Sequence, residues 1–251
     1  MVLSNLFGCG QNNKKQNYLE VKDSNVKGIV RTKYDSPEPS KLQINRKKKN
    51  IKKIKDLGLP TLNELPVVED SKSITPRDAN EIANRAIALT IVAAKGEGLE
   101  QEIINKIIKD WNIDNTFTKQ EREFIDNLNP TNQQKVDFTW KYECLNVLLW
   151  ALGYNESIPE PNEICDVVND VKIVRENSSE KLVENSKLRT IEEILDMNDY
   201  YYRLNWAAVE LRVNNNKSDK INEGIINERH YALNWLIRYL NLSWDEMRTD
   251  T

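Results

Sequence analysis

The residues best suited to chemistry lie together near the end of the chain, in Glu228-Arg229-His230. His230 is the protein's single histidine, and it shares a predicted helix face with Ile226 and Leu233. A functional interpretation makes the imidazole a general acid or base with Glu228 or Arg229 beside it. A structural interpretation makes it a hydrogen-bonded residue between helices. The second is favoured, because the sequence identifies no nucleophile or metal partner for His230.

Glu143 is the second candidate, because it lies in a segment whose apolar run predicts a buried helix. A buried carboxylate needs a cationic partner, since otherwise it would bind a proton. Arg85, Arg203 and Arg229 each lie inside a predicted helix and are the cations that we expect to pair with it. Such a buried pair more often specifies a structure than catalyses a reaction.

Tryptophans accompany these charges, and two of them directly follow an amide, in Asn205-Trp206 and Asn234-Trp235. An indole offers apolar area and one donor, and an amide offers both a donor and an acceptor. We therefore expect a polar cluster with an aromatic surround. The expected cluster comprises Arg85, Glu143, Arg203, Glu228, Arg229 and His230, and the surround comprises Trp140, Trp150, Trp206 and Trp235.

Composition excludes several classes of site. The 251 residues carry 36 Lys plus Arg against 39 Asp plus Glu, so net charge gives no reason to expect a nucleic-acid or membrane partner. One histidine and three cysteines do not supply a zinc cluster, a site with several imidazoles or a disulfide framework. Gly96 and Gly98 lack the third glycine and the preceding strand of a nucleotide-binding loop. We expect no metal and no cofactor.

Positive charge gathers at the start of the chain, where residues 1–60 contain 14 Lys or Arg against 5 Asp or Glu. The basic segment from Arg46 to Lys55 could bind an anionic polymer weakly and without specificity. Aromatic residues do not interleave with it, so it offers no base stacking. A solvated face that contacts the acidic remainder of the same protein is favoured over that alternative.

Residue patterns predict an all-α protein. Capping boxes at Thr118, Thr131 and Thr190 predict three helix starts, and Thr75-Pro76 predicts another that Lys95-Gly96 ends. Residues 1–45 read as a partly ordered basic leader, with room for one short β-hairpin over 18–34, and residues 46–251 as one helical domain. The other expected helices span 45–57, 99–111, 131–152, 167–175, 179–188, 190–214 and 223–240.

Several segments resemble the uncharacterised, largely bacterial family of domains of unknown function DUF4272, over roughly residues 46–251. They include Phe138-Thr139-Trp140-Lys141-Tyr142-Glu143, Leu148-Leu149-Trp150-Ala151-Leu152-Gly153, Glu228-Arg229-His230 and Ala232-Leu233-Asn234-Trp235. The resemblance implies a single helical domain. It implies no established activity, substrate or cofactor.

From these patterns we expect a non-catalytic binding or protein-interaction module built around the polar cluster. One alternative is a hydrolase that uses His230 with Glu143 or Glu228, and the other is the anionic-polymer binder described above. The cysteine usage fits the reducing cytoplasm. The sequence identifies no partner; it is compatible with a protein partner, and it favours neither a membrane nor a specific nucleic acid.

Overall fold

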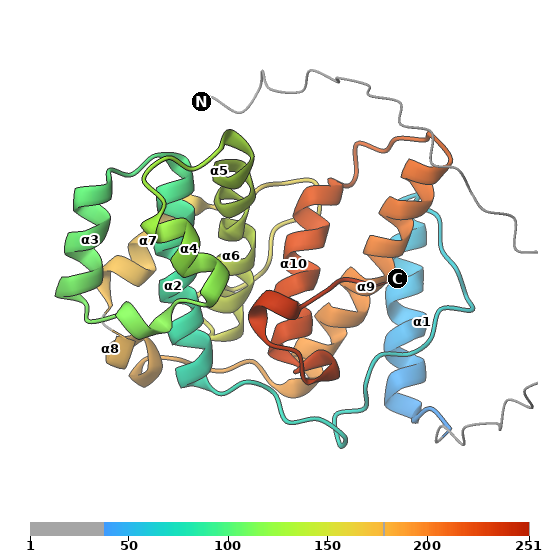
Figure 1. Ribbon diagram of the computed structural model, residues 1–251. Helices are drawn as coiled ribbons and strands as arrows, with labels where there is room; N and C mark the ends of the chain where they lie inside the picture. The colour runs from blue at the N-terminus through green and yellow to red at the C-terminus, as the bar shows by residue number, and fades with distance from the viewer. Residues whose placement is uncertain (1–37, 178, 251) are drawn as a thin grey trace, which may run out of the picture. The chain divides into compact units, whose positions relative to one another are not determined.

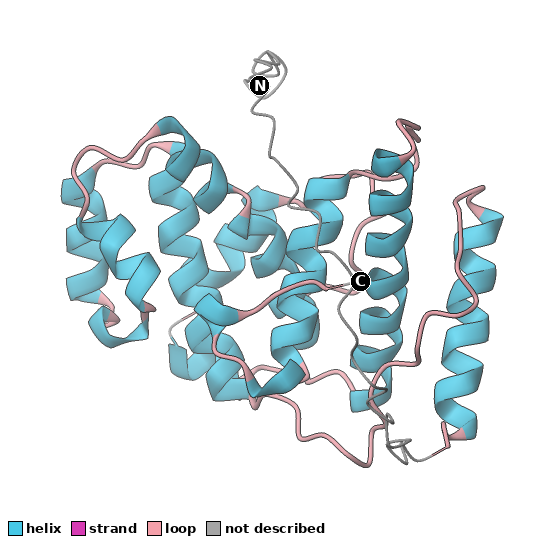
Figure 2. Cartoon of the chain, turned by 45° about the vertical axis from the view of Figure 1, so that its right-hand side comes forward, coloured by secondary structure: helices cyan, strands magenta, loops and turns pink. Residues whose placement is uncertain are grey.

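The computed structural model describes residues 38–177 and 179–250, and the regular elements there are helices (Figures 1 and 2). This confirms the all-α prediction, while the hairpin expected over 18–34 lies outside the described residues. The α-helices are α1 (Lys41–Asp56), α2 (Ala79–Glu97), α3 (Gln101–Asp110), α4 (Lys119–Asp126), α5 (Asn132–Thr139), α6 (Lys141–Ala151), α7 (Val167–Glu176), α8 (Ser179–Glu184), α9 (Ile191–Val213) and α10 (Glu223–Leu236). Short 3₁₀ turns are η1 (Asp114–Thr116), η2 (Tyr239–Asn241) and η3 (Trp244–Glu246).

Five helices pack side by side in the order α2, α6, α10, α9 and α1, which runs from left of centre to the right in Figure 1. Helices α5 and α8 also pack against α2. Helix α6 is covered on more than one side, as its apolar run predicts, and Leu145, Leu148 and Leu149 are fully buried. In this arrangement polar groups on α6, α9 and α10 meet in the interior.

The capping boxes predicted three helix starts correctly. At Thr118, Thr131 and Thr190 the hydroxyl accepts a hydrogen bond from the backbone N–H of the third helical residue, whose side chain bonds back to the cap. The prediction that Thr75 caps this helix is wrong, because α2 begins after Asp78. Asp78 forms the same kind of capping box with Glu81.

The predicted end of α2 at Gly96 is also wrong, since the helix continues to a left-handed Gly98 at φ 113°. Gly96 instead permits a close approach of α5. A Cβ at Gly96 would lie 2.7 Å from the Lys135 carbonyl oxygen and 2.8 Å from the Thr139 hydroxyl. The missing side chain thus brings two helices together, a role that the sequence alone did not separate from a helix stop.

The single helix predicted over 131–152 is divided at Trp140 into α5 and α6. The Thr139 hydroxyl donates to the Lys135 carbonyl at 2.8 Å, and such bonds bend helices. Helix α10 ends at Leu236 instead of reaching residue 240. The Leu236 carbonyl accepts a hydrogen bond from the Arg77 backbone N–H at 2.9 Å, so the segment before α2 occupies the end of α10.

Candidate functional site

The largest fully buried side chain is that of Arg229 on α10. Its Nε donates to Glu143 Oε2 on α6 at 2.8 Å, and its Nη1 donates to the Tyr201 hydroxyl on α9 at 2.9 Å. Burial acts against the charge, but the Tyr201 phenol and the Glu143 carboxylate together raise the pKa of Arg229. This is the pairing that the sequence predicted for Glu143.

The same guanidinium also holds the irregular connection between α6 and α7. Nη1 donates to the carbonyl oxygens of Pro159 at 2.6 Å and Glu160 at 3.2 Å, and Nη2 donates to that of Glu163 at 2.7 Å. Glu143 Oε1 accepts from the backbone N–H of Cys165 at 2.9 Å. Since every nitrogen of the guanidinium and both oxygens of the carboxylate have a partner in the interior, the Arg229–Glu143 pair fixes a loop and offers little to a ligand.

The other charged members of the expected cluster have partners outside it. Arg85 Nη2 lies 2.5 Å from Glu121 Oε2, and Arg203 binds the Asp199 carboxylate through two hydrogen bonds of 2.9 and 2.7 Å. Glu228 Oε2 accepts from Lys141 Nζ at 2.7 Å and from the Cys144 thiol at 3.1 Å. The structure thus joins Arg229 to Glu143 and places Arg85, Arg203 and Glu228 in three separate ion pairs, of which those of Arg85 and Arg203 are buried.

The partners that the sequence analysis missed had signals of two kinds. Asp199 lies one helical turn before Arg203, a spacing at which opposite charges meet, so it could have been found. Glu121 was assigned only to the capping box of α4, where Oε2 does accept from the Thr118 backbone N–H at 2.9 Å. That same oxygen also binds Arg85, so a local signal concealed a tertiary one.

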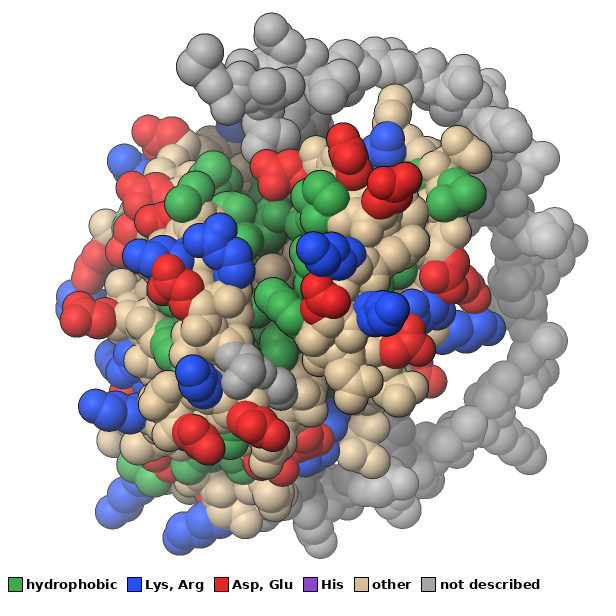
Figure 3. All heavy atoms as spheres, turned by 90° about the vertical axis from the view of Figure 1, so that its left-hand side faces the viewer, with side chains coloured by type: hydrophobic (Ala, Val, Ile, Leu, Met, Phe, Trp, Pro, Cys, Tyr) green, Lys and Arg blue, Asp and Glu red, His purple; other side chains and the backbone are tan. Residues whose placement is uncertain are grey.

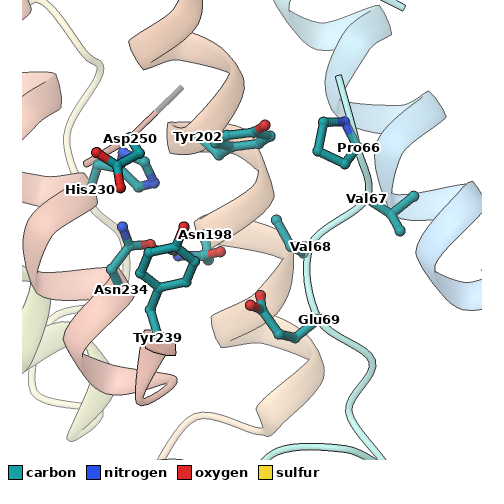
Figure 4. A pocket seen from close by; sticks show the side chains of 10 residues that line it. All are labelled: Pro66, Val67, Val68, Glu69, Asn198, Tyr202, His230, Asn234, Tyr239 and Asp250. Carbon is teal, nitrogen blue, oxygen red and sulfur yellow. Dashed lines mark hydrogen bonds between the residues drawn. The ribbon is translucent and has the colours of Figure 1, made fainter. Parts of the chain in front are cut away.

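His230 lies apart from those pairs, on the wall of a cavity of about 390 Å³. Figure 4 shows His230 and Asn234 of α10 on one side of this space, Asn198 and Tyr202 of α9 behind it, and segment 66–69 opposite. Tyr239 and Asp250 complete the lining. We call this space the His230 cavity; its lining residues are Pro66, Val67, Val68, Glu69, Asn198, Tyr202, His230, Asn234, Tyr239 and Asp250.

The imidazole of His230 is 2% exposed, and its Nδ1 has no hydrogen-bond partner among the described residues. Burial lowers the pKa of His230 to about 3, so the ring is neutral near physiological pH. Neighbouring amides are satisfied by contrast: Asn198 donates to Asn234 at 2.8 Å, and Asn234 donates to the Arg248 carbonyl at 2.9 Å. A neutral imidazole that lacks a hydrogen-bond partner can donate to or accept from a bound group.

The wall opposite α10 is an extended segment held by side chains from two helices. Gln43 of α1 donates to the Val68 carbonyl at 2.7 Å, and Arg203 of α9 donates to the Pro66 carbonyl at 2.9 Å. These bonds fix the backbone of residues 66–68. The buried Arg203–Asp199 pair therefore supports the cavity from behind, although it does not line it.

Comparison with known families assigns the chain by sequence. Residues 46–247 match the family described as Domain of unknown function (DUF4272), which is most of the chain. The chain belongs to this family. No curated protein and no solved structure matches the chain. The segment that the DUF4272 match covers holds the buried ion pairs and every lining residue of the His230 cavity except Asp250.

The tryptophans of this DUF4272 domain stabilise its interior in separate places. Trp235 packs edge-on against Trp244, with ring centroids 5.3 Å apart, and the Arg77 guanidinium lies 4.7 Å from its ring centroid. Trp150 carries Arg189 at 5.6 Å. Trp140 and Trp206 are only half-buried. None of the four tryptophans of the expected surround, Trp140, Trp150, Trp206 and Trp235, lines the His230 cavity.

The basic face of α1 in this DUF4272 domain contacts acidic groups of α9. Arg46 Nη2 lies 2.5 Å from Glu192 Oε2, and Lys49 Nζ lies 2.5 Å from Asp196 Oδ2. These contacts agree with the prediction that the segment meets the acidic remainder of the protein.

The described residues of the DUF4272 domain contain neither a membrane-spanning helix nor a metal-binding cluster. No helix there is long and apolar enough to cross a membrane, and no group of three or more His, Cys, Asp or Glu side chains is arranged to hold a metal ion. The face in Figure 3 carries side chains of both charges, with hydrophobic side chains between them.

Proposed function

We propose that the protein is a non-catalytic binding protein that takes a small molecule into the His230 cavity. What supports this is a single observation: the cavity wall contains a nearly fully buried imidazole whose Nδ1 has no partner. A buried polar atom without a hydrogen bond costs about 1–3 kcal/mol. A ligand group that bonds to His230 would remove that cost.

The hydrolase alternative has less support. It requires Glu143 or Glu228 as the partner of His230, but Glu143 bonds to Arg229 and Cys165, and Glu228 bonds to Lys141 and Cys144. A neutral imidazole whose pKa is lowered to about 3 is also a poor general acid. Binding is the chemistry that this ring can still perform.

A cytoplasmic location is part of the same proposal. Cys144 and Cys165 are both buried free thiols, which suits a reducing compartment. Cell fractionation tests it: recovery of the protein outside the cytoplasmic fraction would contradict the proposal.

The test compares the native protein with His230→Phe, which keeps an aromatic ring of similar size and removes both nitrogens. Small-molecule extract of the source cells should raise the melting temperature of the native protein and leave that of His230→Phe unchanged. In the absence of extract, His230→Phe should be at least as stable as the native protein, because an unsatisfied buried group has been removed.

Tyr142→Phe is the matched control, since Tyr142 is a buried aromatic residue outside the cavity lining. It should respond to the extract as the native protein does. An extract that stabilises His230→Phe as much as the native protein, or that stabilises neither, would refute binding at this cavity.

A further inference from the structure

The two charged side chains that line the His230 cavity, Glu69 and Asp250, are both carboxylates. We propose that the cavity recognises a protonated amine, so that its ligand is a small molecule with an ammonium group attached to an apolar body. This deepens the proposed function and rests on it. Two acidic side chains alone would not identify a ligand, but here they share a cavity with the unpartnered, buried Nδ1 of His230.

Glu69 is the principal carboxylate in this argument. It is half-buried, it has no hydrogen bond or ion pair with the described residues, and Figure 4 shows its carboxylate directed toward α9. An unpaired carboxylate on a partly desolvated wall attracts a cation and repels an anion. The wall therefore selects the sign of the ligand.

The phenol of Tyr239 is affected by the same charge. Burial first, and then the carboxylates of Asp250 and Glu69, raise the pKa of this phenol. Both carboxylates thus act across the cavity on a group that lies between them. The ring faces of Tyr202 and Tyr239 supply apolar area, and an aromatic face also attracts an ammonium group.

Two arginines lie near the cavity and leave this charge in place. Arg203 is bound through two hydrogen bonds by Asp199, which is buried with it. Arg248 Nε lies 3.3 Å from Asp250 Oδ2, but the side chains are 57% and 60% exposed. Such an exposed pair contributes little stability, so an ammonium group can take the place of Arg248.

The neutral His230 ring completes the recognition. With its pKa lowered to about 3, the ring carries no positive charge that would oppose an ammonium group, and a neutral imidazole that lacks a hydrogen-bond partner can accept one of the ammonium hydrogens. Carboxylate, neutral acceptor and aromatic face are together the surroundings that favour an amine. A carboxylate or phosphate group would find no cationic side chain among the lining residues.

The test uses three probes of similar shape: 2-phenylethylamine, 2-phenylethanol and phenylacetate. Binding to the full-length protein is measured by calorimetry at low salt and by NMR shifts of the imidazole protons of His230. The amine should bind up to about fivefold more tightly than the alcohol, as expected for one partly exposed ion pair, and phenylacetate should bind most weakly.

Glu69→Gln should weaken amine binding about fivefold and leave the alcohol unaffected. Glu64→Gln is the control, because it removes the same charge nearby. Glu64 lies in the same connection between α1 and α2, is exposed and does not line the cavity. The inference is overturned if the alcohol or phenylacetate binds as well as the amine, if no probe binds at millimolar concentration, or if the two variants behave alike. If the alcohol or the anion binds tightly, the preference for an amine is refuted but the cavity is still a binding site. Failure of the extract experiment would instead refute binding at the cavity itself.

Discussion

Replacing Arg229 with methionine is the substitution for which we expect the largest loss of stability. Methionine retains much of the apolar length of the side chain and removes the guanidinium. Glu143, whose side chain is 4% exposed, would then remain in the interior without its cation. The Pro159, Glu160 and Glu163 carbonyl oxygens would lose their shared donor as well.

The expected magnitude follows from the ion pair. Removing one partner of a buried pair costs about 3–5 kcal/mol, because the other charge is left uncompensated. For a domain of this size, each kcal/mol shifts the melting temperature by about 2–4 °C, so Arg229→Met should melt at least about 6 °C below the native protein. The unbonded carbonyls of the loop add to that loss.

Urea unfolding followed by circular dichroism measures the difference in the free energy of unfolding. The double variant Arg229→Met/Glu143→Leu, which removes both charges, should recover part of the loss, whereas Glu143→Leu alone should be strongly destabilised. The recovery should be incomplete, because the Cys165 backbone N–H still lacks its acceptor. A cost below about 1 kcal/mol for Arg229→Met would refute this account, since it would mean that Glu143 is solvated or protonated without its partner.

Three further predictions concern other features. Because the pKa of His230 is lowered to about 3 in the folded protein, the unfolded chain binds more protons between that value and 6.5. Stability should therefore decrease as pH falls, by between about 1 and 2 kcal/mol from pH 6.5 to pH 5, and a His230→Gln variant measured by urea unfolding should show a smaller decrease. Gly153→Ala should reduce the free energy of unfolding by more than about 2 kcal/mol, because its φ is 84° and a Cβ there would collide with a backbone carbonyl. Gly58 has a similar φ of 75° but lies in open space, so Gly58→Ala should cost only about 1 kcal/mol; thermal unfolding measures both. Burial raises the pKa values of the Cys144 and Cys165 thiols, so both should react with a thiol reagent only after unfolding. The measurement uses a variant in which Cys9 is replaced by serine, and rapid reaction of its native state would contradict their burial.

Helix positions followed from local patterns wherever local interactions determine them. The capping boxes at Thr118, Thr131 and Thr190 gave correct starts, because both hydrogen bonds of the box form within four residues. The errors at Gly96 and at the end of α10 arose from tertiary contacts. A glycine pressed against α5 and a carbonyl bonded to Arg77 have no signature in the neighbouring sequence.

The candidate site was predictable only in part, for a related reason. Burial of the charged residues followed from their apolar neighbours, and the pairing of Glu143 with one arginine was among the expected options. Which arginine it meets depends on how α6 lies against α10, and that packing is not encoded in the spacing of either helix. The His230 cavity could not be foreseen, because segment 66–69 forms one wall and carries no motif.

The dependence of the loop on Arg229 has a consequence for synthesis of the chain. The carbonyls that the guanidinium binds precede it by 66 to 70 residues, and Glu143 precedes it by 86. A ribosome therefore makes α6 and the loop that follows it well before it makes Arg229. Arg229 is the residue that pairs with Glu143 of α6 and orders the loop. Until α10 has emerged, α6 can pack against α2, but the face that α10 covers in the folded protein is open to chaperones and proteases. A nascent chain halted before Arg229 leaves Glu143 without its cation and this face of α6 uncovered.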